Sequence, residues 1–262
     1  MTSSAQILIL AVVQGVTEFL PVSSSGHLVL AKAVLGLETP EGPVLEVMLH
    51  GGTMVAILAY YWRRLLELAR GVLAREPRAW STVIGLGLAG VPAVLVYALL
   101  GDRIEAQFNR PGVAAAMLCV TGLGLLSLRR APVGRDEPRP GTALLIGVAQ
   151  AVALLPGISR SGATLVAGRW LRLEPGRVAE TSFLMVLPLI AGAVALHLPD
   201  ALAPASRALL PLPALALGFV VSALVGYAAL ALLIRAFSGR HFHWFGFYCL
   251  AVGVLGLCLG RL

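Results

Sequence analysis

The sequence predicts an all-α protein that crosses a membrane several times, and its composition and its long apolar runs both indicate this. Of the 262 residues, 58% are hydrophobic and 13% are charged, with a mean hydropathy of +0.87. A soluble domain carries roughly 25% charged residues. Six apolar runs approach the roughly 20 residues that a membrane span needs: 44–62, 80–100, 112–128, 181–198, 211–234 and 244–260. We expect one membrane domain over 1–262 with six full crossings.

Two further apolar segments, 5–35 and 143–172, are interrupted in their middles by polar residues, proline and glycine. The first contains EFLPVSSSGH over 18–27, and the second contains PGISRSGAT over 156–164. Irregular backbone at membrane depth is tolerated where it lies within protein or lines a water-filled cavity. We therefore expect each segment to form a re-entrant helix–loop–helix whose loop lines a cavity.

The two polar segments are related by an internal repeat. Sliding the chain on itself by 136 positions places Gln14 on Gln150 and aligns the Ser-x-Ser-Gly that the two motifs share. Each half, about 1–136 and 137–262, then holds one re-entrant segment followed by three spans, and this odd number of crossings inverts the second half. In many transporters, inverted repeats with interrupted helices build a substrate site near the bilayer midplane. The sequence therefore predicts a site where the two polar loops meet.

The net charge of +7 comes largely from arginines that gather in alternate loops. The arginine-rich loops are 63–79, 129–140, 172–178 and 235–243. Cytoplasmic loops of membrane proteins carry an excess of Lys and Arg, so we expect these loops in the cytoplasm and both termini outside. This distribution explains the positive charge without a nucleic-acid partner, and membrane lipids are the expected surroundings.

Together the two polar loops carry a carboxylate, an imidazole, a guanidinium and several hydroxyl groups: Glu18, Ser24, Ser25 and His27 in the first, and Ser159, Arg160, Ser161 and Thr164 in the second. Arginine and free backbone N–H groups suit a phosphate. Glutamate and histidine suit proton transfer or metal coordination. Gln14 lies one helical turn before Glu18 and shares its face. Ionisable residues inside a membrane are functional by default, so these loops are the candidate site.

Structural explanations for the same residues are also open. Glu18 and Arg160 could form a structural ion pair, and serines in membrane helices commonly bond to neighbouring helices. His27 could cap a helix. His50, one turn after Glu46, is a weaker candidate for the cavity.

The two polar motifs resemble the signatures of a known family. QGVTEFLPVSSSGH (14–27) resembles the first signature of the undecaprenyl-diphosphate phosphatase family of the bacitracin-resistance type, and LPGISRSGAT (155–164) is similar to the second. The likeness continues through MLHGGT (48–53) and covers nearly the whole chain. It implies hydrolysis of undecaprenyl diphosphate to undecaprenyl phosphate and phosphate in the bacterial plasma (inner) membrane. That reaction recycles the lipid carrier of cell-wall synthesis and confers resistance to bacitracin.

The resemblance also implies roles for individual residues. Glu18 is implied as the essential carboxylate, Ser24 as the candidate nucleophile, and His27 as a base or acid. The implied diphosphate cradle is Arg160 with Ser159, Ser161, Thr164, Ser23, Ser25 and Gly26. The family requires a divalent cation, Mg²⁺ or Ca²⁺. The first position of its first motif is Glu or Gln, and this chain has Gln14 there. Because Gln14 carries no charge, Glu18 is the expected ligand of the cation. Whether Ser24 or a water molecule attacks phosphorus is open.

The main alternative is a flippase or transporter that moves the lipid phosphate through the same midplane site, since inverted repeats are typical of transporters. A purely structural scaffold would leave Glu18 and Arg160 unexplained. Phosphate release by purified protein in detergent separates an enzyme from a flippase, because a detergent solution has no compartments. Whether the protein forms a homodimer is also open.

Overall fold

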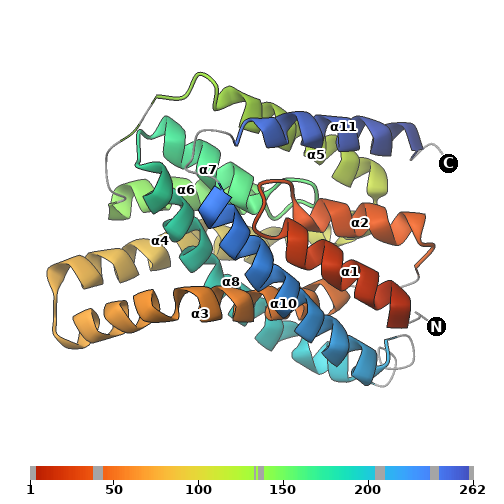
Figure 1. The fold of residues 1–262 in the computed structure, drawn as a ribbon, viewed down its shortest axis with the longest axis horizontal. Coiled ribbons are helices and arrows are strands. Elements are labelled where there is room, and N and C mark those ends of the chain that lie inside the picture. The colour runs from red at the N-terminus through yellow and green to blue at the C-terminus, as the bar shows by residue number, and fades with distance from the viewer. Residues whose placement is uncertain are drawn as a thin grey trace.

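The computed structural model describes residues 4–37, 44–132, 134, 139–203, 210–236 and 242–259, and these residues form helices and no strand. The first half holds α1 (Ser4–Thr17), α2 (Ser24–Val34), α3 (Val44–Leu73), α4 (Pro77–Glu105), the 3-10 turn η1 (Ala106–Asn109) and α5 (Pro111–Ser127). The second half holds α6 (Pro140–Val152), α7 (Arg160–Trp170), α8 (Pro175–Leu202), α10 (Leu212–Ala236) and α11 (Trp244–Leu259) (Figure 1).

Among the described residues, four helices are long and apolar enough to cross a membrane: α3, α4, α8 and α10. They confirm the prediction of a helical protein with several membrane spans. The spans predicted at 112–128 and 244–260 form α5 and α11, which have 17 and 16 residues and pack against each other. The number of six full crossings therefore stays a prediction.

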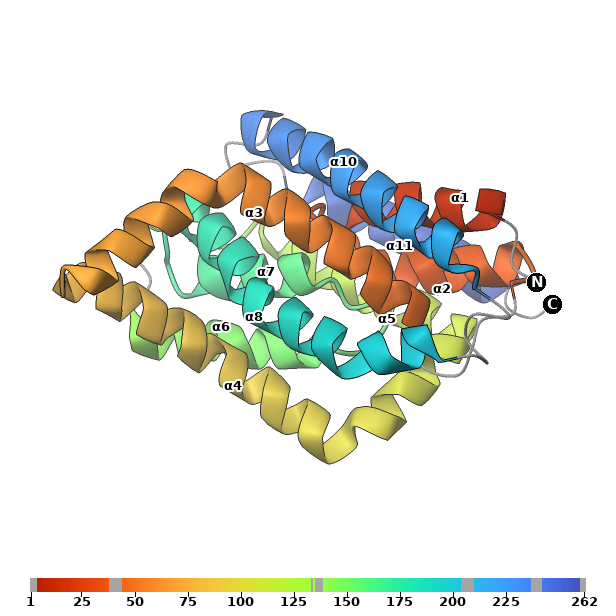
Figure 2. The same cartoon turned by 90° about the horizontal axis from the view of Figure 1, so that it is seen from below.

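The loop predicted at 63–79 is largely helical. Helix α3 continues to Leu73 and α4 starts at Pro77, so the connection is reduced to residues 74–76. With 30 and 29 residues, these two helices exceed the roughly 20 that a bilayer requires. Their joined ends form the hairpin that projects farthest from the two termini (Figures 1 and 2).

Each polar segment forms a pair of short helices joined by a non-helical loop, α1 with α2 and α6 with α7. Helices α1 and α2 lie toward the end of the molecule that carries both termini, and α6 and α7 lie toward the other end (Figure 1). Helix α1 packs against α10, and α6 packs against α4. Each short pair is thus held by a long helix from the other half. The inversion of one half relative to the other stays a prediction.

The two loops end in the same helix cap, as the aligned motifs suggest. Ser23 caps α2 by accepting a hydrogen bond from the backbone N–H of Gly26 at 3.2 Å. Ser159 caps α7 by accepting one from Gly162 at 3.0 Å. Serine is a favoured N-cap residue because its oxygen satisfies a backbone donor that the helix leaves free. The caps fix the direction in which α2 and α7 leave their loops.

Glycines let the two loops touch. A Cβ atom added to Gly26 would lie 2.8 Å from the Cα of Gly157. Gly157 itself has a positive φ of 97°, and a Cβ there would lie 2.1 Å from the carbonyl oxygen of Ala114. Only glycine adopts such a conformation at no steric cost. The close approach is completed by Ser161, whose hydroxyl donates to the carbonyl of Leu20 at 3.1 Å.

The contact between the loops is expected to be sensitive to one added methyl group. Gly26→Ala should push the loops apart and lower the free energy of unfolding by about 1–3 kcal/mol, the usual range for overpacking. Gly124→Ala is the matched control, because a Cβ at Gly124 meets nothing within 4 Å. Thermal unfolding of both variants in detergent tests this. Equal stability of the two variants would contradict the tight contact.

Candidate functional site

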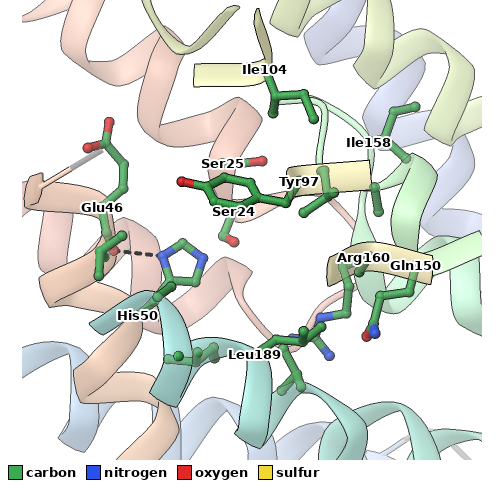
Figure 3. Close-up of a pocket in the computed structure, with 18 of the residues that line it drawn as sticks. Ser24, Ser25, Glu46, His50, Tyr97, Ile104, Gln150, Ile158, Arg160 and Leu189 are labelled. Atoms are coloured by element: carbon green, nitrogen blue, oxygen red, sulfur yellow. Dashed lines mark hydrogen bonds between the residues drawn. The ribbon is translucent and has the colours of Figure 1, made fainter. Parts of the chain in front are cut away.

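A cavity of about 440 Å³ lies where the two loops meet α3, α4 and α8. Figure 3 shows Ser24, His50 and Arg160 around it. Most of its polar residues come from both loops and from α3: Glu18, Ser23, Ser24, Ser25, Glu46, His50, Ser159, Arg160 and Ser161. Helices α4, α6 and α8 add Tyr97, Glu105, Gln150 and His197. Its apolar wall comes mainly from α4 and α8, with Val94, Ala98, Leu189 and Leu196 among its residues. The cavity therefore places a polar region beside an apolar surface.

Glu18 lies at the centre of the polar wall and is buried, with 6% of its surface exposed. One carboxylate oxygen, Oε1, accepts a hydrogen bond from Arg160 Nη2 at 2.6 Å. The other, Oε2, accepts from the Ser24 hydroxyl at 2.6 Å and from the Gln14 amide at 3.0 Å. Gln14 shares the face of Glu18, as their spacing of four residues predicts. Phe19, packed edge-on against Phe183 of α8, anchors the loop beside this carboxylate.

Arg160 begins α7 and reaches Glu18 across 142 positions of sequence. Its Nη1 also donates to the backbone carbonyl of Ser182 in α8 at 3.1 Å. The structure therefore contains the ion pair that the sequence left open as an alternative. Because Arg160 also lines the cavity, the pair does not exclude contact with a phosphate, and that contact stays a prediction.

The hydroxyl-bearing residues divide into two groups. Ser23, Ser24, Ser25, Ser159 and Ser161 line the cavity. Thr164 is fully buried and does not line it; its hydroxyl bonds to the carbonyl of Arg160 at 2.9 Å and to Ser182 Oγ at 2.7 Å. Thr164 thus supports the helix turn that carries Arg160. Gly26 contributes through the hydrogen bond that its N–H donates to Ser23 Oγ and through its close contact with Gly157.

The structure does not bring His27 to the cavity. Its Nδ1 bonds to the carbonyl of Ser23 at 2.8 Å and its Nε2 to the hydroxyl of Tyr248 in α11 at 2.9 Å. Its ring stacks on Tyr248 instead, which holds the side chain away from the cavity. A role for His27 in proton transfer stays a prediction, and neither of these two hydrogen bonds joins it to Ser24.

His50 occupies the position beside Glu18 instead. Its Nε2 lies 3.2 Å from Glu18 Oε2, and it lines the cavity. The spacing of one turn after Glu46 singled His50 out, but only as a weaker candidate. Sequence reasoning missed Ser182, whose carbonyl accepts from Arg160, and Tyr97, which lines the cavity, because no motif connects them to the loops.

The residues around Glu18 do not fit a divalent cation held by the protein alone. Both carboxylate oxygens are taken by N–H and O–H donors, and one donor is the guanidinium of Arg160. Among the described residues, no three His, Cys, Asp or Glu side chains could hold a metal ion. Mg²⁺ and Ca²⁺ favour several oxygen ligands, which this donor set does not supply. The cation that the resemblance implies stays a prediction.

Comparison with known proteins places these residues in a family. Residues 7–255 match the family described as bacitracin resistance protein BacA. The chain belongs to this family. A protein of Rhodopirellula baltica named undecaprenyl-diphosphatase is 39% identical over an alignment that covers 97% of each chain. Proteins of the same name from Rubrobacter xylanophilus and Deinococcus radiodurans are 40% and 38% identical over 95% and 96% of this chain, and over 96% and 93% of their own.

In this BacA-family chain, the pair of Glu18 and Arg160 is expected to contribute to stability as well as to the site. Removing one partner of a buried ion pair leaves an unpaired charge and typically costs about 3–5 kcal/mol. Glu18→Ala and Arg160→Ala should each lower the melting temperature, and the double variant should recover part of the loss. Melting temperatures of the three variants measure the coupling. Two single losses that simply add would contradict a direct pair.

Proposed function

We propose that this protein hydrolyses undecaprenyl diphosphate to undecaprenyl phosphate and phosphate. The observation that carries the proposal is the contact of Ser24 with Glu18 at 2.6 Å, next to Arg160, in a cavity with one apolar wall. Relatives of nearly equal length, 34–40% identical, bear the name undecaprenyl-diphosphatase. A carboxylate, a nucleophile and a guanidinium at one place are what phosphoryl transfer asks for, since it depends on positioning and charge stabilisation.

The cavity suits the head of a lipid diphosphate and leaves the tail in the bilayer. Its volume of about 440 Å³ is at the lower end of the range for small-molecule sites and takes a diphosphate with only the first part of a prenyl chain. Apolar residues of α4 and α8, including Val94, Ala98 and Leu189, line one side. We propose that the tail leaves along this apolar side, so the lipid enters without leaving the membrane.

Ser24 is placed to attack the terminal phosphorus. In the proposed step its oxygen forms a bond to that phosphorus, its proton passes to Glu18 Oε2, and the bond to the bridging oxygen breaks. Undecaprenyl phosphate departs and a phosphoserine remains. Water then cleaves the phosphoserine, leaving its hydroxyl group on phosphorus and a proton on Ser24 Oγ. The proton that Glu18 accepted leaves with undecaprenyl phosphate, which restores the carboxylate. Arg160 would stabilise the charge on the transferred group.

Two other predictions are attack by water in place of Ser24 and transport of the lipid without hydrolysis. For the first, the same carboxylate would take a proton from water. For the second, the relatives are named undecaprenyl-diphosphatase, a name that describes hydrolysis and not transport.

The proposed location is the bacterial plasma membrane, with both termini outside. The structural support is that the arginine-rich hairpin of α3 and α4 lies at the end opposite to both termini (Figure 1). Basic ends of spans face the cytoplasm. That the protein forms a homodimer also stays a prediction.

The charge of Glu18 is expected to be needed for turnover. Glu18→Gln keeps the shape of the side chain but removes the base, so phosphate release from undecaprenyl diphosphate in detergent should fall by about 10²-fold or more. Glu67→Gln is the control, because Glu67 is exposed on α3 and pairs with Arg64 at the surface. Wild-type protein that releases no phosphate would contradict the proposed function.

A covalent route predicts a phosphorylated Ser24. Rapid acid quench of wild-type protein turning over labelled diphosphate should trap the label on the chain, and Ser24→Ala should remove both the label and about 10²-fold or more of the turnover, since nucleophile and base act as a unit. A Ser24→Ala protein with a small loss of activity would favour attack by water.

A further inference from the structure

The ring of His50 is held with both nitrogens on acceptor atoms. Nδ1 lies 2.7 Å from the backbone carbonyl oxygen of Glu46, which accepts hydrogen bonds and cannot donate them. Nε2 lies 3.2 Å from Glu18 Oε2. The side chain is 24% exposed, and this exposed part faces the cavity. Figure 3 shows the ring below Ser24, with the bond to Glu46 drawn as a dashed line.

This arrangement requires a proton between His50 and Glu18. A neutral imidazole has one donor and one acceptor nitrogen. Because Nδ1 donates to Glu46, a neutral ring would turn the lone pair of Nε2 toward a carboxylate oxygen, and two lone pairs repel. The contact at 3.2 Å is attractive only when a proton lies between the two atoms. The site therefore carries an imidazolium paired with a carboxylate, or the equivalent pair with the proton on Glu18.

We propose that His50 is the proton donor to the phosphate that departs, an inference that rests on the proposed hydrolysis. As the bond between the bridging oxygen and the terminal phosphorus breaks, the Nε2 proton of His50 passes to that oxygen. In the same step Glu18 takes the proton of the attacking hydroxyl group, from Ser24 or from water. Glu18 then returns its proton to His50 Nε2, which restores the starting pair. One proton has moved from the attacking group to the departing phosphate, and none is lost.

Other side chains at the site are less suited to this step. An arginine side chain does not act as a proton donor in proteins, so Arg160 is suited to stabilising charge and not to this step. Among the described histidines, His27 bonds to Ser23 and Tyr248, and His197 contacts Tyr97, Glu105 and Asp200. Neither has a contact with Glu18 or Ser24 among those that the structure shows. His50 alone of the described histidines contacts the carboxylate that would act as the base.

A structural role for His50 makes a different prediction from a proton donor. If the ring only holds Glu18 in place, His50→Gln should preserve activity, because the glutamine amide also donates a hydrogen bond toward Glu18. If His50 gives up a proton, His50→Gln should fail, because an amide has no proton to transfer at neutral pH. Positioned proton donors contribute about 10²–10⁴-fold to a rate.

The test compares two substrates in detergent: farnesyl diphosphate and a farnesyl-tagged dinitrophenyl phosphate, whose acidic phenolate departs without a proton. For His50→Gln we expect kcat on the diphosphate to fall by about 10²-fold or more, with KM nearly unchanged, and kcat on the phenyl ester to fall by less than about tenfold. The ratio of the two rates in one sample does not depend on the folded fraction, so partial unfolding cannot imitate the result. His243→Gln, which removes a histidine of the loop before α11, is the matched control and should keep both rates.

Equal losses on both substrates, or near-normal turnover of the diphosphate by His50→Gln, would overturn the role of His50 and leave the proposed hydrolysis standing. Wild-type protein inactive on both farnesyl diphosphate and undecaprenyl diphosphate would instead refute the hydrolysis, and with it the role of His50.

Discussion

The ion pair of Glu18 and Arg160 is the interaction on which the rest of the site depends. It joins the two loops through residues that are 142 positions apart in the sequence, and both side chains are largely buried. Taking two charges out of water is expensive, and their attraction compensates only when the geometry is good and further hydrogen bonds satisfy the remaining atoms. Ser24, Gln14 and Ser182 supply those bonds. The same contacts that make the pair tolerable therefore place a hydroxyl, a carboxylate and a guanidinium around one cavity.

The packing of the loops explains why this pair can form at all. Ser23 and Ser159 cap the helices that leave the loops, and Gly26 lies against Gly157 without side chains between them. Long helices from the opposite half hold each short pair, α10 against α1 and α4 against α6. The irregular backbone thus lies inside protein, which is the condition for its presence at membrane depth. A diphosphate that binds Arg160 would compete with Glu18 for it, which links substrate binding to the freeing of the carboxylate.

Much of this was predictable from the sequence. The apolar runs predict the helices because a bilayer admits little else, and the two polar motifs predict the loops because they interrupt those runs. The resemblance carried by the motifs is confirmed by the family match over residues 7–255, and Glu18, Ser24 and Arg160 do lie together. The position of His27 was not predictable, because the partner that holds its ring, Tyr248, lies 221 positions away in α11. His50 was underrated because its contact with Glu18 depends on how α3 packs on α1. Periodicity within α3 alone does not contain that information.

A structure of the protein with a methylene-bridged farnesyl diphosphate analogue, which cannot be hydrolysed, tests the central claim most directly. We expect the diphosphate between the N-termini of α2 and α7, with phosphate oxygens on the Arg160 guanidinium and the terminal phosphorus facing Ser24 Oγ and His50. The prenyl chain should lie along the apolar residues of α4 and α8. Phosphates bound away from this cavity, with Arg160 still paired to Glu18 and Ser24 out of reach, would contradict a single site built from the two loops.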